Sequence, residues 1–296
     1  MDEPTETPVR TRSAGALALG ATSAIADVHR IRTGRVLFAL AMIGLGLRGL
    51  RYGDLAGVWQ HLPIAVPGEA LIAGACALIE LAGGVGLLMP RTARPAAATL
   101  AAFLLLWCAL LKLPGVVAMP AMEATWLGLG EIVVLLAGAW LIHAAFASPL
   151  GAERGVLTGV RGVRNARLAF ALALPTIGLS HFIYADVTAG FVPAWLPWRH
   201  GWAYLTGAAN LATCLALLLG VWPRLAAALE AGMLAVITLL VWVPALVTQP
   251  SSGTWAAFLI SSAIAAGAWV VADSYRGVAW FATATPRIRR DAPVSL

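Results

Sequence analysis

The chain has 296 residues, of which 60% are hydrophobic and only 11% are charged, and its net charge is +6. Soluble domains are on average less apolar and about twice as rich in charged residues, so this composition excludes an ordinary soluble protein. The arginines that give the positive charge lie mostly in loops and tails, which makes nucleic acid an unexpected partner. We expect an integral membrane protein whose main partner is the lipid bilayer.

Apolar runs of about 18 to 23 residues, the length that crosses a bilayer, follow one another along the chain. Residues 1–34 carry acidic residues before arginines, unlike a signal peptide, and we interpret them as a tail. Residues 148–166 are interpreted as a linker and residues 276–296 as a second tail. The eight predicted spans are 35–52, 69–89, 95–117, 124–146, 167–184, 201–221, 225–247 and 254–275.

The distribution of basic residues predicts the orientation of the spans, because cytoplasmic loops are rich in Arg and Lys. One side of the predicted membrane carries only four of the 20 basic residues, namely Arg48, Arg51, Lys112 and Arg199. Both termini are therefore predicted to be cytoplasmic. The excess of Arg over Lys, with abundant Ala and Gly, is typical of a GC-rich bacterial genome, so we expect a bacterial inner membrane.

The two halves of the chain repeat each other. Residues 35–41 (RVLFALA) align with 167–173 (RLAFALA), and AGAW occurs at both 137–140 and 266–269, while the offset drifts only from 132 to 129. This indicates a tandem duplication of a four-helix unit. An even number of helices gives both copies the same orientation. We expect an all-α membrane protein with two tandem four-helix bundles in parallel orientation, at 35–147 and 167–275.

The second copy contains YLTGAANLATCLALLLGVWPRLAA at 204–227 and GLSHF at 178–182. These stretches resemble the DoxX-like membrane proteins, a group that includes the DoxD-type thiosulfate:quinone oxidoreductase subunits. The pattern of that family is YLTG, two residues, Glu, a Leu/Gly-rich run and then Pro-Arg. The first copy has Glu80 but reads LIAG instead of YLTG, and the second has YLTG but Asn210 in place of Glu. The resemblance implies a duplicated member of the family that works with a membrane oxidoreductase.

Four ionisable side chains interrupt the apolar helices of the first copy, and the second copy has lost all four charges. A carboxylate near the centre of a bilayer costs roughly 2.5 to 3.5 kcal/mol on insertion scales. We therefore expect the two acids and two bases to pair inside the first bundle, as either a functional polar site or a structural ion-pair cluster. The four residues are Arg48, Glu80, Lys112 and Glu131, and their counterparts are Ser180, Asn210, Trp242 and Ile260.

Other polar residues are weaker candidates for ligand binding. His181 lies in the stretch that matches the family, and Asp54 and Asp186 follow a helix end in both copies, where turn formation also explains them. Asn210 occupies the position of the family's Glu. Glu230, in the seventh span, is interpreted as structural. The spacing of His and Cys matches neither a zinc site nor a haem pair, so we expect no metal.

The sequence likewise predicts no intrinsic redox cofactor. If the protein takes part in electron transfer, membrane quinone is the most natural electron carrier for it to use. A buried carboxylate beside Arg or Lys suits quinone reduction, which consumes protons. The leading hypothesis is an accessory or quinone-interacting subunit of a membrane oxidoreductase system, with a redox partner protein. One alternative is a carrier or binding protein for a small solute, with an outward-facing pocket. Another is a structural membrane partner without activity of its own.

Overall fold

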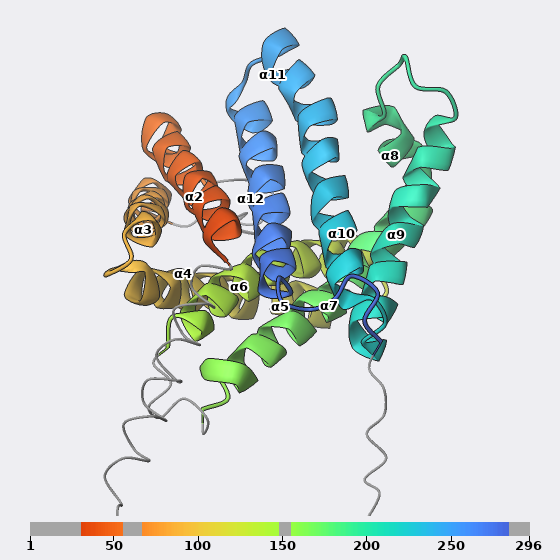
Figure 1. The fold of residues 1–296 in the computed structure, drawn as a ribbon. Coiled ribbons are helices and arrows are strands. Elements are labelled where there is room, and N and C mark those ends of the chain that lie inside the picture. The colour runs from red at the N-terminus through yellow and green to blue at the C-terminus, as the bar shows by residue number, and fades with distance from the viewer. Residues whose placement is uncertain (1–30, 56–66, 148–154, 284–296) are drawn as a thin grey trace, which may run out of the picture.

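The computed structural model describes residues 31–55, 67–147 and 155–283. Eight helices in these ranges are long and apolar enough to cross a membrane, as the sequence predicted (Figure 1). Outside the ranges lie most of the N-terminal tail (1–30), part of the linker (148–154) and the end of the C-terminal tail (284–296). The first copy contains α2 (Arg32–Tyr52), α3 (Glu69–Leu88), α4 (Ala93–Trp107), the π-helical turn η1 (Cys108–Lys112), α5 (Leu113–Ala118) and α6 (Glu123–Ala145). The second contains α7 (Gly159–Ile183), α8 (Ala185–Phe191), α9 (Arg199–Leu219), α10 (Pro223–Ile237), the π-helical turn η3 (Thr238–Trp242), α11 (Val243–Thr248) and α12 (Ser252–Ser274).

The fifth span begins earlier than the sequence predicted. Hydropathy places a linker at 148–166, whereas α7 already starts at Gly159. Its first two turns carry Arg161 and Arg164 at exposed positions. Arginines there lower the hydropathy but have good helix propensity, so the helix extends beyond the apolar run.

The third and seventh spans are interrupted by a π-helical turn at the same place in each copy. The turn η1 ends at Lys112 and η3 ends at Trp242, exactly one repeat offset of 130 residues later. Each turn is followed two residues later by a proline, Pro114 or Pro244. Proline has no N–H to donate to the carbonyl four residues back, so the helix widens locally instead. The same irregularity thus occurs at equivalent positions of the sequence repeat.

Each copy also has a cation–π contact between its first helix and the end of its last helix, where the chain enters the copy. The guanidinium of Arg35, near the start of α2, lies 5.3 Å from the centre of the Phe146 ring, just after α6. The equivalent Arg167 of α7 lies 3.8 Å from the centre of the Tyr275 ring, just after α12. Both are cation–π contacts between the first helix of a copy and the end of its last helix.

Much of the helix packing crosses between the copies. α2 packs against α3 and also against α12, while α6 packs against α4, α7 and α12. In Figure 1 α12 accordingly lies between α2 and the α10–α11 segment. The copies therefore interlock through their first and last helices.

The crossing of α6 and α12 brings equivalent glycines of the two copies together. A Cβ atom added to Gly138 would lie 3.0 Å from the Cα atom of Gly267, and one added to Gly267 would lie 3.0 Å from the carbonyl oxygen of Val134. Gly138 and Gly267 are the same position of the repeated AGAW. Small residues allow such close backbone contact between membrane helices.

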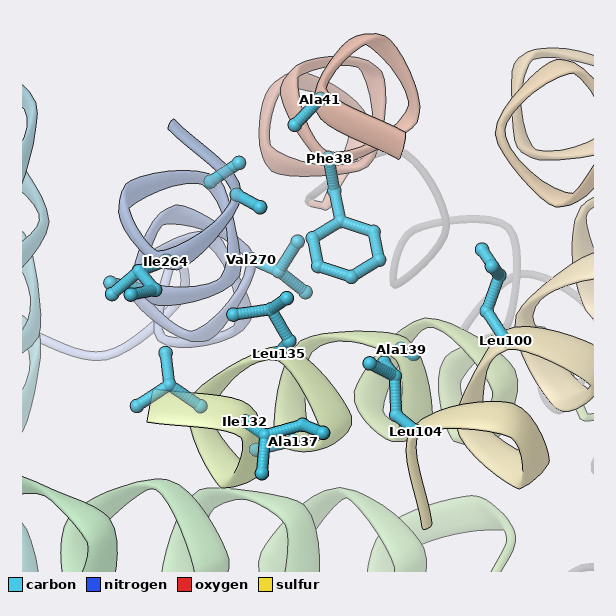
Figure 2. Close-up of a cluster of buried hydrophobic side chains, with 14 of the residues drawn as sticks. Phe38, Ala41, Leu100, Leu104, Ile132, Leu135, Ala137, Ala139, Ile264 and Val270 are labelled. Carbon is cyan, nitrogen blue, oxygen red and sulfur yellow. The ribbon is translucent and has the colours of Figure 1, made fainter. Parts of the chain in front are cut away.

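The hydrophobic core surrounds this crossing. Figure 2 shows Phe38 of α2 pointing between α12 and α6, towards Val270 and Leu135. Leu100 and Leu104 of α4 approach from the side of α3. In the same view α2 and α12 are seen nearly end-on and α6 from the side. Large apolar side chains such as Leu71 and Leu110 remain exposed on the outer surface, as expected for helices that face lipid.

The first and last helices of the body meet at one end of the molecule. The backbone N–H of Gly34, in the first turn of α2, donates to a carboxylate oxygen of Asp273 in α12 at 2.7 Å. An anion at a helix N-terminus is stabilised by the helix dipole and the free N–H groups. Asp273 also forms an ion pair with Arg276 at 2.7 Å. Both ends of the helical body therefore lie on the same face.

Candidate functional site

Arg48, four residues before the end of α2, is held by a polar cluster that joins the copies. Its guanidinium forms an ion pair with Asp54 Oδ1 at 2.5 Å and donates to Ser252 Oγ at 2.5 Å. The Ser252 hydroxyl donates in turn to Asp54 Oδ2 at 2.8 Å. Arg48 is only 6% exposed. The structure thus makes Asp54 an ionic partner of Arg48, and Ser252 supplies the contact from α12.

The structure brings together two other members of the predicted quartet, Lys112 and Glu131. Lys112 ends η1, and its Nζ atom lies 3.4 Å from the position that a Cβ atom of Gly128 would take. The ammonium therefore rests against the second turn of α6, and it interacts electrostatically with Glu131, one turn further along. Both side chains are half-buried. A glycine at 128 leaves the space that the lysine uses.

Glu123 is a third member of this site that the sequence analysis missed. It is the first residue of α6, it is buried, and it interacts electrostatically with Glu131. Neither of its carboxylate oxygens has a hydrogen-bond partner among the described residues. The predicted span began at residue 124, one position too late to include it. The spacing of eight residues from Glu131, which is one helix face, was the available signal.

The duplication explains why Glu123 has no ionic partner in the part of the chain that the structure describes. By the offset of 129, Glu123 is the counterpart of Ser252, which binds Arg48 and Asp54. At the related place in the second copy the arginine is replaced by Ser180, which cannot form an ion pair. The Ser180 hydroxyl instead donates to the carbonyl oxygen of Ile177 at 2.7 Å.

Glu80 lies in the interior of the first copy, on α3, and is 2% exposed. It interacts electrostatically with Cys76, one turn earlier, whose thiol contacts Trp107 of α4. Glu80 is thus engaged between α3 and α4, on the inner face of the copy.

The weaker candidates of the second copy have mostly local partners. His181 Nδ1 lies 2.8 Å from the carbonyl oxygen of Ile177, and Asn210 Nδ2 donates to the carbonyl oxygen of Thr206 at 2.9 Å. Asn210 is fully buried, and its Oδ1 has no hydrogen-bond partner among the described residues. These side chains are therefore held mainly by the backbone of their own helices.

Asp186 belongs to an exposed contact on the surface of α8 and α9. Its carboxylate lies 2.9 Å from His200 Nε2, which forms an ion pair when the imidazole is protonated. Both side chains are largely exposed to the surroundings. An exposed pair of this kind contributes roughly 0 to 1 kcal/mol, so Asp186 stands apart from the buried groups of the first copy.

An apolar groove of about 560 Å³ runs along the outer surface of the first copy. It lies between α3 and α4, on the face of α3 that carries Leu78 and Leu81. A groove of this composition suits an acyl or isoprenoid chain. Its lining residues are Leu78, Leu81, Ala82, Val85, Gly86, Met89, Thr92, Pro95, Ala96 and Thr99.

Comparison with known proteins gives one match. The family described as "Domain of unknown function (DUF8561)" matches residues 168–259, from the start of the second copy into α12. No curated protein and no solved structure matches the chain. The match lies outside the segment that contains Glu80, Lys112, Glu123 and Glu131.

Proposed function

We propose that the chain is a duplicated DoxX-like protein that serves a quinone-linked redox system as an accessory or quinone-interacting subunit. In this proposal the copies lie in parallel orientation in a bacterial inner membrane, with both termini in the cytoplasm. The observation that carries the proposal is the half-buried Lys112 beside Glu131, with Glu123 on the same face of α6. One base and two acids thus share one apolar region of the first copy.

The chemistry of this group of side chains suits quinone. Reduction of a quinone places negative charge on its carbonyl oxygens and consumes protons, so it needs donors at those oxygens. The Lys112 ammonium can donate to a carbonyl oxygen, and a carboxyl group at Glu131 can exchange protons with it. The groove between α3 and α4 provides an apolar surface for an isoprenoid tail in the same copy.

The experiment that tests this proposal is purification of the full chain with its native lipids, followed by mass spectrometry of the extracted lipids. We expect bound quinone, and we expect Lys112→Met and Glu131→Gln to reduce the amount retained. A hydrogen bond to a charged group contributes about 1.5 to 3 kcal/mol, which corresponds to roughly a 10- to 150-fold loss of affinity.

The matched control is Asn210→Ala, which removes a buried polar side chain from the second copy. It should leave quinone retention unchanged. Wild-type protein that carries no quinone, or equal retention by the Lys112, Glu131 and Asn210 variants, would exclude a quinone site at Lys112. Uptake of a small weakly acidic solute by proteoliposomes, lost in Lys112→Met, would instead support a carrier.

A further inference from the structure

The second copy contains a buried carboxyl group that the proposed quinone site does not use. Glu230 lies on α10, two turns after the helix begins at Pro223, and is 1% exposed. Neither of its carboxylate oxygens has a hydrogen-bond partner among the described residues. Thr213 of α9 lies close enough to interact with the carboxyl group, but the two side chains do not form a hydrogen bond of normal geometry.

The charged groups on the same and neighbouring helices are engaged elsewhere. Arg224, the basic residue of α10, donates to the carbonyl oxygen of Val278 at 3.0 Å instead of pairing with Glu230. Asp273, the ionisable residue of α12, is bound by Arg276. On α9 the nearest titratable side chain is Cys214, which is buried next to Thr213, and the others are Arg199, His200 and Tyr204 at the far end.

The first copy shows that this position can be filled without a polar group. By the offset of 130, the counterparts of Glu230 and Thr213 are Leu100 and Gly83. A Cβ atom added to Gly83 would lie 2.6 Å from Leu100 Cγ, so the leucine packs directly on the glycine. The four-helix unit therefore folds around an apolar pair, and its packing does not require the carboxyl group.

An ionised carboxylate in this setting is costly, because it is removed from water without a compensating cation. A carboxyl group that carries its proton is neutral, and its O–H can donate to the Thr213 hydroxyl. When the proton leaves, the same hydroxyl can turn and donate to the carboxylate, since a hydroxyl is both donor and acceptor. Thr213 can thus form a hydrogen bond with both the protonated and the ionised form of Glu230.

We infer that Glu230, with Thr213 beside it, is a reversible proton-binding site in the second copy, separate from the Lys112–Glu131 site. The ligand is a proton, taken from water and returned to it as the carboxyl O–H bond forms and breaks. The site stands on its own and does not depend on quinone binding in the first copy.

Labelling with dicyclohexylcarbodiimide tests this inference in the full chain reconstituted into phosphatidylcholine vesicles. The reagent enters membranes and adds the O–H of a protonated carboxyl across one C=N bond. The carboxyl oxygen bonds to the central carbon, the proton moves to nitrogen, and rearrangement leaves a stable N-acylurea. Mass spectrometry of the digested protein then measures the modified fraction of the peptide that contains Glu230.

We expect Glu230 to be modified and the modification to decrease as the pH rises. Glu230→Gln should lose this label while the labels on other peptides remain. Thr213→Val should move the half-maximal pH of labelling upward by about one unit, because the ionised form loses a charge-assisted hydrogen bond. If Glu230→Gln does not fold, Glu230→Leu combined with Thr213→Gly restores the pair of the first copy and should lack the label.

Several outcomes would overturn the inference. Glu230 is not a proton site if it stays unmodified at every pH at which the protein remains folded while other carboxyl groups react. Labelling that depends neither on pH nor on Thr213 would show a carboxyl without reversible exchange. Protection by sodium ions at constant pH would show that the site binds a metal cation instead of a proton.

Discussion

Replacing Gly138 or Gly267 by Ala should destabilise the protein, because the backbones of α6 and α12 are in close contact at these glycines. A Cβ atom at Gly138 would lie 3.0 Å from Gly267 Cα and 3.4 Å from Phe38 Cε2. Carbon atoms in contact are normally about 3.5 to 4.0 Å apart. Neither α6 nor α12 can relieve the overlap by a side-chain rotation, because the obstructing atom belongs to the backbone.

The expected magnitude follows from two opposing effects. Overpacking of this kind costs typically about 1 to 3 kcal/mol. Alanine recovers about 1 kcal/mol from its better helix propensity. Each single variant should thus lose about 0 to 2 kcal/mol of unfolding free energy. The double variant should lose less than the sum, since one separation of the helices relieves both contacts.

Gly232→Ala supplies the matched control, because a Cβ atom there meets nothing within 4 Å. It should gain only the free energy that comes from the better helix propensity of Ala. The difference in unfolding free energy between Gly232→Ala and Gly138→Ala therefore measures the cost of the overlap. The stability of both variants is measured by unfolding with sodium dodecyl sulfate in mixed micelles, monitored by circular dichroism. Equal stability of Gly138→Ala and Gly232→Ala would refute the close crossing of α6 and α12.

Three further predictions concern the buried charges. Arg48→Met should lower the unfolding free energy by about 1 to 3 kcal/mol. This is less than for a fully buried ion pair, because Asp54 is half exposed. A change within about 0.5 kcal/mol in the micelle assay would argue against the cluster with Ser252. The variants Lys112→Met, Glu131→Gln and their combination should show a coupling energy of about 0.5 to 3 kcal/mol in a double-mutant cycle, and purely additive effects would mean that the two side chains act independently. Wild-type protein should lose stability as the pH rises from about 4.3, the pKa of Glu in an unfolded chain, to the pH at which the folded protein releases the Glu230 proton. Glu230→Leu with Thr213→Gly should remove that part of the pH dependence, and parallel thermal-unfolding curves for the two proteins over this range would contradict it.

The membrane-spanning helices could be predicted from the sequence because hydropathy and helix length encode them directly. The second span was expected at 69–89 and runs from Glu69 to Leu88. The start of α7 could not be predicted in this way, because Arg161 and Arg164 belong to the helix but not to the apolar run. Hydropathy measures the apolar length of a helix, not its full length.

Contacts between the copies were the main feature that the sequence did not reveal. The repeat predicts which helices are equivalent, but equivalence does not say which helices are neighbours. Ser252 reaches Arg48 across 204 residues, and neither sequence spacing nor periodicity predicts that pairing. The quartet was expected to close on itself, whereas Arg48 is bound by Asp54 and Lys112 lies beside Glu131. Only the three-dimensional arrangement of α2, α6 and α12 separates these two groups.

The pattern of agreement between the copies bears on what the buried charges are for. Features that shape the backbone occur in both copies, namely the arginine–aromatic contact, the π-helical turn before a proline and the glycine at the central crossing. Several ionisable groups occur in one copy only: the counterparts of Lys112, Glu131 and Glu230 are Trp242, Ile260 and Leu100, and those of Arg48, Glu80 and Glu123 are the uncharged polar residues Ser180, Asn210 and Ser252. A charge needed to hold the four-helix unit together would be needed twice. Since each is present once and costs free energy to bury, the asymmetry favours a functional site over a structural ion-pair cluster.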